Sequence, residues 1–504
     1  SDGYIMAIKG YNFYLNGEKI NSLPQPSPVF TFTGLSSATH YHITTEAVDV
    51  AGNVSPQSAV LETDTLEHTS ADDPMSDADK AIVDGFIAMY KGRASGMQIS
   101  MSGPKGYYAK AYGKDYGTKD LTIDDKMHYG SCTKMYVGVL ICKRIEEGLL
   151  SWDNVLEDFE TTKGVKNGDI ITVKMLLMQR SGVWEVVDAA SPFGQAGYLT
   201  PTGTGDPMPY IRAAPSQFPP GTQYRYSNSN YILLGEILRQ IDIDHGSSRS
   251  VADIFREDCF DALDLTETEW RMGPYMQPPY SRGWTDNPAY PTIVATITSL
   301  PLYWLLGSLY WALAPGLAGG WQITPTYEFT AFDPSWAGTA GCFDGTVSDL
   351  HKFGEALRDG LLLSPAMVQE REETWGPYII YTPQNPWEGK GWMGGGLGIM
   401  SFGQWRGWNG GAAGYGSACW YNPKNGAVIA ILRNWFGPIE PWSVVLRIIY
   451  EFWPDTIDLE EWKVRVHSGI SATNAFGTAK AYRWHTPGDA NGVTQLPHKV
   501  GYYL

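Results

Sequence analysis

Ser131 and Lys134 lie three residues apart in the stretch HYGSCTKMYVGVLICKRIEEGLL, residues 128–150. Apolar residues recur at helical spacing after them and Gly148 stands where a helix usually ends, so the pattern predicts a buried helix with Ser131 in its first turn. The positive end of the helix dipole favours an alkoxide there. A partly buried lysine loses its proton more easily than one in water, which makes Lys134 a candidate base. On this stretch alone, a capping serine followed by a surface lysine is the simpler interpretation.

Four further stretches follow the Ser131 segment in an order that chance would rarely supply. One of them contains Tyr226 and Asn228, which taken singly are typical of a core aromatic and of a helix N-cap. The set as a whole therefore carries more weight than any member. The stretches are ITVKMLLMQRSGV at 171–183, FPPGTQYRYSNSNYILLGEIL at 218–238, GCFDGTVSDLHKFGEALRDGLLLSPA at 341–366 and GWNGGAAGYGSACWYNP at 407–423.

The elements that must position these residues follow an α+β pattern. A helix is predicted over 78–92, and a strand pair follows in GMQISMS and GYYAKAYG. Two more strands, GYGSACWYNP and GAVIAILRN, come at the far end. The region between them is helical and rich in loops. Strands from both ends should therefore form one antiparallel sheet with an inserted helical region.

The composition excludes several classes of function. A chain of 504 residues is too long for one ordinary core, so two or more domains are expected. The net charge of −17 argues against nonspecific nucleic-acid binding, because a polyanion would be repelled from most of the surface. Five cysteines without a C-x-x-C and nine histidines without an H-E-x-x-H predict buried free thiols and no metal site.

The domain organisation is predicted from shifts in pattern. Residues 1–66 are expected to form a small all-β fragment with an N-G turn in YNFYLNGEKI, and 67–77 form a polar linker. The main domain is expected over 78–454, and 455–504 form an extension without a readable motif. The segment FTGLSSATHYHITTEAVDVAGNVSPQS resembles the later strands of a fibronectin type III module. The opening strands of such a module are missing, so we expect the natural polypeptide to extend upstream.

An apolar, aromatic insertion is expected over 270–340. Residues 287–327 contain no Asp, Glu, Lys or Arg. A spanning helix needs about 20 mainly apolar residues, but Pro301, Gly307 and Pro315 interrupt this one. We therefore expect the insertion to pack on the protein or to form an apolar lip. Contact of residues 294–321 with lipid is a lesser alternative. We do not expect the segment to span a bilayer.

The ordered stretches resemble the serine β-lactamase, DD-peptidase and penicillin-binding protein superfamily, and most closely its class C and β-lactamase-fold esterase branch. The resemblance covers roughly 78–453. It implies a β-lactamase/transpeptidase-like fold in which Ser131 is the nucleophile and Lys134 helps to deprotonate it. It also implies that Tyr226 shuttles the proton and that Asn228 hydrogen-bonds Lys134 and the substrate.

This sequence lacks one motif of the family, the K-T-G triad. Counting back from AGYGS, the family's K-T-G falls on Trp408, Asn409 and Gly410, which the resemblance marks as substrate-binding residues. The backbone N–H groups of Ser131 and Gly411 would then form the oxyanion hole. Loss of the lysine should weaken recognition of a free carboxylate by about 1.5–3 kcal/mol. Trp408 is similar to what β-lactamase-fold esterases carry.

Two functional hypotheses follow from these residues. The first is a serine hydrolase that forms an acyl-Ser131 intermediate on an ester or a D-amino-acid amide of the cell wall or envelope, either as an esterase or as a D-alanyl-D-alanine carboxypeptidase-like enzyme. The second is a catalytically inactive protein that binds the cell surface. The partial fibronectin-like module ahead of this domain looks like minor tail proteins of actinobacterial phages, which would place the chain in a virion or outside the cell, among other tail proteins. Neither hypothesis needs a metal or an organic cofactor.

Overall fold

The chain divides into two compact units, residues 1–74 with 103–107 and residues 75–102 with 108–504. The division after Pro74 falls within the stretch predicted as a linker. The computed structural model describes residues 8–19, 40–64, 73–90, 96–115, 119–186, 205–273, 275–285, 327–328, 330, 333–377, 393–412, 414–436 and 441–457.

The smaller unit is an antiparallel sheet with the strand order β2-β1-β3-β4. Asn16 and Gly17 both have positive φ, 50° and 84°, which suits a two-residue hairpin turn between β1 and β2. The predicted N-G turn is therefore confirmed. The predicted strand PVFTFTGL lies outside the described residues. The strands are β1 (Ile8–Leu15), β2 (Glu18–Lys19), β3 (His40–Asp49) and β4 (Leu61–Asp64).

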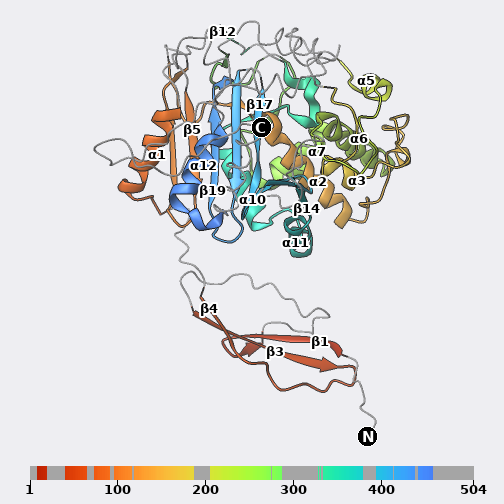
Figure 1. Cartoon of the computed structure of the whole chain (residues 1–504), viewed down its shortest axis with the longest axis vertical. Helices are drawn as coiled ribbons and strands as arrows, with labels where there is room; N and C mark the ends of the chain where they lie inside the picture. Colours follow the sequence, from red (N-terminus) through yellow and green to blue (C-terminus); the bar gives the residue numbers. More distant parts are fainter. Residues whose placement is uncertain are drawn as a thin grey trace, which may run out of the picture. The chain divides into compact units, whose positions relative to one another are not determined.

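The larger unit is built on an eight-stranded sheet whose order is β14-β15-β16-β17-β18-β19-β5-β6 (Figure 1). All neighbouring pairs are antiparallel. Strands from both ends of the domain thus lie in one sheet, as predicted. They are β5 (Met97–Ser102), β6 (Tyr108–Tyr112), β14 (Trp375–Pro377), β15 (Met393–Gly396), β16 (Met400–Phe402), β17 (Trp405–Ala412), β18 (Tyr415–Tyr421) and β19 (Val428–Arg433).

Helices cover both faces of this sheet. Successive residues of a strand point to opposite faces. A Cβ on Gly354 of α10 would lie 2.9 Å from the sulfur of Cys419, whereas the next residue, Trp420, stacks on Trp442 of α12 with ring centroids 4.3 Å apart. Helices α10 and α12 therefore pack on opposite faces. The helices are α1 (Asp77–Tyr90), α2 (Thr133–Glu146), α3 (Val173–Leu177), α5 (Met208–Ala213), α6 (Asn228–Asp244), α7 (Val251–Phe255), α10 (Val347–Asp359), α11 (Pro365–Glu373) and α12 (Pro441–Phe452).

Short strands and turns connect these layers. One three-stranded sheet has the order β10-β13-β9, and its strand β9 directly precedes the Ser131 turn. A second one has the order β12-β11-β20. These elements are β7 (Lys114–Asp115), β8 (Lys119–Asp120), β9 (Met127–His128), β10 (Glu269–Trp270), β11 (Trp284–Thr285), β12 (Tyr327–Glu328), β13 (Phe343–Gly345) and β20 (Trp435–Phe436), with the turns η1 (Gly130–Cys132), η2 (Leu156–Asp158), η3 (Arg256–Phe260), η4 (Asp261–Leu263), η5 (Pro334–Ala340) and η6 (Pro454–Thr456).

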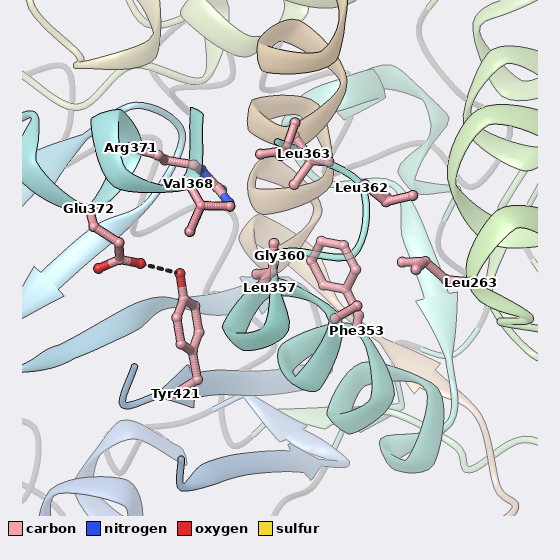
Figure 2. Close-up of a pocket in the computed structure, with 12 residues that line it drawn as sticks. Leu263, Phe353, Leu357, Gly360, Leu362, Leu363, Val368, Arg371, Glu372 and Tyr421 are labelled. Carbon is pink, nitrogen blue, oxygen red and sulfur yellow. Dashed lines mark hydrogen bonds between the residues drawn. The ribbon is translucent and has the colours of Figure 1, made fainter. Parts of the chain in front are cut away.

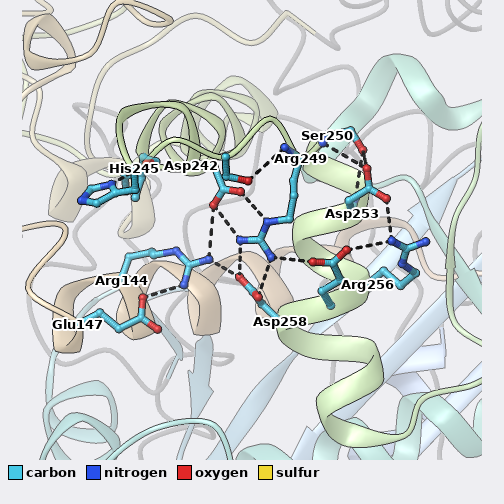
Figure 3. Close-up of polar contacts among 12 residues, drawn as sticks. Arg144, Glu147, Asp242, His245, Arg249, Ser250, Asp253, Arg256 and Asp258 are labelled. Atoms are coloured by element: carbon cyan, nitrogen blue, oxygen red, sulfur yellow. Dashed lines mark hydrogen bonds and ion pairs between the residues drawn. The ribbon is translucent and has the colours of Figure 1, made fainter.

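An ion network ties the C-terminal ends of α2 and α6 together (Figure 3). Arg249 donates from Nε and Nη2 to the two carboxylate oxygens of Asp242 on α6, at 2.6 and 2.9 Å. Its Nη1 donates to Asp258 at 2.9 Å, and Arg144 on α2 also pairs with Asp258. Both arginines thus bridge helices through partly buried carboxylates.

Two other predictions concern thiols and membranes. All five cysteines are buried and free, as expected. Among the described residues, no helix is long and apolar enough to cross a membrane. The uncharged stretch 287–327 lies outside the described residues except for Tyr327, and the predicted extension 455–504 is described only as far as Ile457.

Candidate active site

Ser131 lies in a single 3₁₀ turn, η1, that leads directly into α2. The sequence predicted that Ser131 lies in the first turn of the helix, whereas the structure places it in the turn that precedes the helix. Gly130 has φ +52°, and a Cβ there would lie 2.9 Å from the backbone nitrogen of Gly411 on β17. Glycine is needed because the turn passes this close to the strand. Ser131 is half-buried, and its hydroxyl faces the groups described next.

Lys134 is fully buried, and its amine has three hydrogen-bond partners. Nζ donates to Ser131 Oγ at 3.0 Å, to Asn228 Oδ1 at 2.7 Å and to the carbonyl oxygen of Ala340 at 2.5 Å. Burial lowers the pKa of Lys134 to about 7, although the negative charge of Glu185 acts to raise it. The amine therefore loses its proton far more easily than an exposed lysine does.

Tyr226 approaches the same hydroxyl from another part of the chain. Its phenol donates to Ser131 Oγ at 2.8 Å. The Lys134 amine lies 5.0 Å from the centroid of the Tyr226 ring and 5.5 Å from that of Tyr231. The structure thus brings together the four side chains that the sequence singled out for chemistry, Ser131, Lys134, Tyr226 and Asn228.

Asn228 is the first residue of α6 and not its N-cap. Its side chain bridges two charged groups, because Oδ1 accepts from Lys134 and Nδ2 donates to Glu185 Oε2 at 3.1 Å. The backbone N–H of Asn228 donates to the same carboxylate oxygen at 2.5 Å. Glu185 therefore satisfies the first free N–H of the helix.

The loop that ends with Tyr226 and the first turn of α6, which contains Asn228, are held by hydrogen bonds from side chains. Gln179 Oε1 accepts from the N–H of Ser227 at 2.8 Å and from Asn230 Nδ2 at 2.5 Å. Ser229 Oγ donates to the carbonyl of Trp184 at 2.6 Å. Gln179 itself has φ +59°, an uncommon conformation for a residue with a Cβ. The polar run in YSNSN is thus explained by the attachment of this loop.

The residues in place of the K-T-G triad, Trp408 to Gly410, lie on β17 beside the Ser131 turn. A Cβ on Gly410 would lie 2.0 Å from the Tyr129 carbonyl, so only glycine fits. Trp408 is 3 % exposed and packs near Tyr226 and Tyr231, with ring centroids 6.4 and 5.7 Å away. Trp408 therefore packs against the rings of Tyr226 and Tyr231, and little of its surface is accessible to a substrate.

Asn409 points to the opposite face of β17 from Trp408. Its Oδ1 accepts a hydrogen bond from Trp420 Nε1 at 2.8 Å. Gly411 is exposed. Substrate contacts by Asn409 and Gly410 and an oxyanion hole formed by the N–H groups of Ser131 and Gly411 stay predictions.

A separate apolar pocket lies between α2, α10 and α11 (Figure 2). Val139, Phe353 and Leu363 are among its lining residues. Tyr421 donates to Glu372 at its edge, at 2.8 Å. Ser131, Lys134 and Tyr226 do not line it. This pocket is therefore distinct from the reactive cluster.

Comparison of the sequence with family models identifies the family of the domain that contains these residues. Residues 80–450 match the family model for β-lactamase. The chain belongs to the β-lactamase family. It is thus a member of the serine β-lactamase/transpeptidase superfamily of acyl hydrolases, and the predicted fold class is confirmed.

Solved structures agree with this β-lactamase-family fold. A D-stereospecific amidohydrolase from Streptomyces sp. is 21 % identical with a TM-score of 0.54 over 75 % of this chain and 98 % of that one. A D-amino acid amidase from Ochrobactrum anthropi SV3 is 19 % identical, with a TM-score of 0.56 over 74 % and 98 %. A penicillin-binding protein homologue from Pyrococcus abyssi is 20 % identical, with a TM-score of 0.55 over 74 % and 76 %.

A curated relative matches only a part of this β-lactamase-family chain. The probable fimbrial assembly protein FimD, serogroup H1, of Dichelobacter nodosus is 29 % identical over 133 residues, which are 25 % of this chain. The match spans 31 % of that relative's length.

Sequence reasoning missed two groups that contact the centre of the site. Glu185 lies just beyond the quoted stretch 171–183, and a single glutamate in a loop carries no motif. The Ala340 acceptor is a backbone oxygen, which any residue type would supply. Only the path of the chain brings these groups to Asn228 and Lys134. No cluster of three or more His, Cys, Asp or Glu that could hold a metal ion occurs within the described ranges.

Proposed function

We propose that this β-lactamase-family member hydrolyses acyl compounds through a covalent acyl-Ser131 intermediate. The observation that carries the proposal is the convergence of Lys134 and Tyr226 on Ser131 Oγ, at 3.0 and 2.8 Å. An acyl-transfer site needs a nucleophile with a proton acceptor and a proton donor within hydrogen-bond reach.

The hydrogen bonds of Lys134 support its role as the base. The neutral amine has two N–H bonds and one lone pair. Asn228 Oδ1 and the Ala340 carbonyl can only accept hydrogen bonds, so they take the two N–H bonds. The lone pair is then left for the hydroxyl proton of Ser131. Because burial brings the pKa of Lys134 to about 7, this neutral form is populated at physiological pH.

The reaction then follows in two balanced steps. Ser131 Oγ attacks the acyl carbonyl carbon while its proton passes to Lys134. The bond to the leaving alcohol or amine then breaks as Lys134 gives this proton, by way of the Tyr226 hydroxyl, to the leaving group. Water next attacks the acyl-serine ester and gives its proton to the same groups, which releases the carboxylic acid and restores the Ser131 hydroxyl.

The proposed substrate is an ester or a D-amino-acid amide of the cell wall or envelope. The names of the amidohydrolase and D-amino acid amidase among its structural neighbours support the amide class. Trp408 in place of the family lysine supports an acyl group without a free carboxylate, because no cation from that position would pair with one.

Labelling with acylating probes tests this proposal. A fluorophosphonate and a fluorescent penicillin are incubated with the wild type and with Ser131→Ala. We expect labelling of the wild type by the fluorophosphonate, weaker labelling by the penicillin, and none of the variant. Folded wild type that no acylating probe labels would contradict the proposal.

The inactive alternative predicts a different result. A protein that binds the cell surface without turnover would keep its adsorption in Ser131→Ala while probes never label the wild type. The fibronectin-like character of the smaller unit, a role in a phage tail and a place in the virion or outside the cell remain proposals from the sequence resemblance alone.

A further inference from the structure

The carboxylate of Glu185 binds Asn228, which in turn contacts the Lys134 amine. Its Oε2 accepts from the backbone N–H and from Nδ2 of Asn228, at 2.5 and 3.1 Å. We propose that Glu185 is a positioning residue, which fixes the side of the Asn228 amide that faces Lys134 and holds a negative charge near that amine. This inference rests on the proposed function, because it assigns Glu185 a part in the reaction of Ser131.

The two sides of a carboxamide differ in their hydrogen-bonding capacity. Asn228 presents an oxygen on one side and an NH₂ group on the other, whereas an ionised carboxylate only accepts hydrogen bonds. Nδ2 must therefore face Glu185, and Oδ1 must face the Lys134 amine. A reversed amide would present N–H groups to Lys134. The neutral amine would then turn its lone pair toward Asn228 and away from Ser131.

The Glu185 carboxylate lies at the start of α6. Ser227, the N-cap residue of this helix, makes no side-chain capping bond. Glu185 takes over that role by accepting from the first N–H of the helix. A negative charge at a helix N-terminus is stabilised by the helix dipole. Glu185 and the first residue of α6 therefore hold each other in place.

Two opposing effects act on the pKa of Lys134. Burial lowers the pKa of Lys134, and the charge of Glu185 acts against this effect. Cys132, Tyr226 and Tyr231 also lie near the amine within the described residues. Burial raises the pKa of the Cys132 thiol to about 12, and the rings of Tyr226 and Tyr231 lie 5.0 and 5.5 Å away. Glu185 therefore keeps the pKa of the amine near neutrality.

Three variants of Glu185 separate orientation from charge. Glu185→Gln keeps an acceptor for Asn228 but removes the charge, Glu185→Met removes both, and Glu185→Asp keeps the charge on a shorter side chain. Glu160→Gln is the matched control, because it removes a carboxylate whose side chain is 74 % exposed. Two quantities are measured against pH: the ¹³C shift of the Lys134 ε-carbon in protein labelled with [ε-¹³C]lysine, and the second-order rate constant of fluorophosphonate labelling.

We expect both midpoints to fall by about one pH unit in Glu185→Gln, with a high-pH rate within about threefold of the wild type. Glu185→Met should show the same fall and a high-pH rate about tenfold lower. Glu160→Gln should match the wild type. An unchanged Lys134 midpoint in Glu185→Gln, or an unchanged high-pH rate in Glu185→Met, would overturn the inference.

The design keeps this inference apart from the proposed function. The Lys134 shift is measured without any substrate, so it still judges Glu185 if the probe never reacts with the wild type. If Glu185→Gln does not fold, Glu185→Asp decides. A retained midpoint with a rate about threefold lower is expected, and a rate equal to that of the wild type would contradict the positioning role.

Discussion

Helices α2 and α6 contact each other and carry a polar cluster at each end, and the two clusters treat charge in opposite ways. At the N-terminal ends, the Lys134 amine is fully buried among neutral partners, and its pKa is lowered to about 7. At the C-terminal ends, Arg249 and Arg144 are paired with carboxylates, and the pKa values of both arginines are raised (Figure 3).

The charge of Lys134 can change near neutral pH, whereas the charges of Arg249 and Arg144 cannot. A base must exchange its proton near the working pH, which burial without a directly paired anion allows. A link between helices needs permanent charges, which a bidentate arginine–carboxylate pair provides. The same two helices thus present a titratable end to Ser131 and a fixed end to the rest of the domain.

Removal of Lys134 should have the largest effect on reactivity. In Lys134→Met, the base is lost, so the rate constant of fluorophosphonate labelling should fall by about 10³-fold or more. The free energy of unfolding should not fall by more than about 1 kcal/mol, because a buried amine is replaced by an apolar side chain of similar length. Urea unfolding measures the second quantity.

Lys143→Met is the matched control for this variant, since it removes a half-buried amine from the same helix. Its labelling rate should stay within about twofold of the wild type. A large loss of stability in Lys134→Met would contradict the view that this end of the helices is specialised for chemistry.

Removal of Arg249 should give the opposite result. In Arg249→Met, Asp242 and Asp258 lose their bridging cation, so the free energy of unfolding should fall by about 2 kcal/mol, while the labelling rate of the folded protein changes by less than about threefold. Arg239→Met, which removes a partly exposed i,i+3 pair with Glu236, should cost less than about 0.5 kcal/mol. Equal costs for the two variants would show that the network is not a specific link.

The pH dependence of labelling should report the titratable end. Lys134 must be neutral to accept the Ser131 proton, and its pKa is lowered to about 7. The rate should therefore fall as the pH drops through about 7, by about tenfold for each unit below 6. Since the amine of an unfolded lysine titrates near 10.4, the unfolded chain binds more protons between about pH 7 and 10.4, and this group favours folding increasingly as the pH rises through that window. A rate independent of pH between 5 and 9 would be incompatible with Lys134 as the base.

The smallest effect concerns the fixed end at acid pH. Burial acts to raise the pKa of Asp258, but hydrogen bonds from Arg249 and Arg144 outweigh it and hold this pKa below its usual value. The contribution of this carboxylate to stability is therefore present above about pH 4 and is lost as the pH falls through its folded-state pKa. Between pH 5 and 3, the wild type should lose about 1 kcal/mol more than Arg249→Met in urea unfolding. Identical losses would contradict this assignment.

The predictable part of the molecule is the part in which residue type carries the information. The stretches GMQISMS, GYGSACWYNP and GAVIAILRN predicted β5, β18 and β19. The ordered motifs predicted that Ser131, Lys134, Tyr226 and Asn228 belong together. Trp408 was identified by its place in a motif. Its burial behind Tyr226 depends on the pairing of β17 with β18, which no local pattern specifies.

The parts that sequence reasoning missed depend on the path of the backbone. The Ala340 carbonyl reaches Lys134 only because η5 packs against α6, where Thr339 Oγ1 donates to the Tyr231 carbonyl at 2.6 Å. Glu185 accepts hydrogen bonds from Asn228, which lies 43 residues away in the chain. Asn228 looked like a helix cap, but it is the first residue of the helix and is capped by another side chain.

The most direct test of the account is an intact-mass measurement of a covalent adduct. The protein is incubated with a small panel of esters, penicillins and D-Ala-D-Ala peptides, quenched with acid, and the modified peptide is then mapped. The account predicts at least one acyl adduct on Ser131 that is absent from Ser131→Ala. An adduct on another residue, or none from any member of the panel on folded protein, would contradict it.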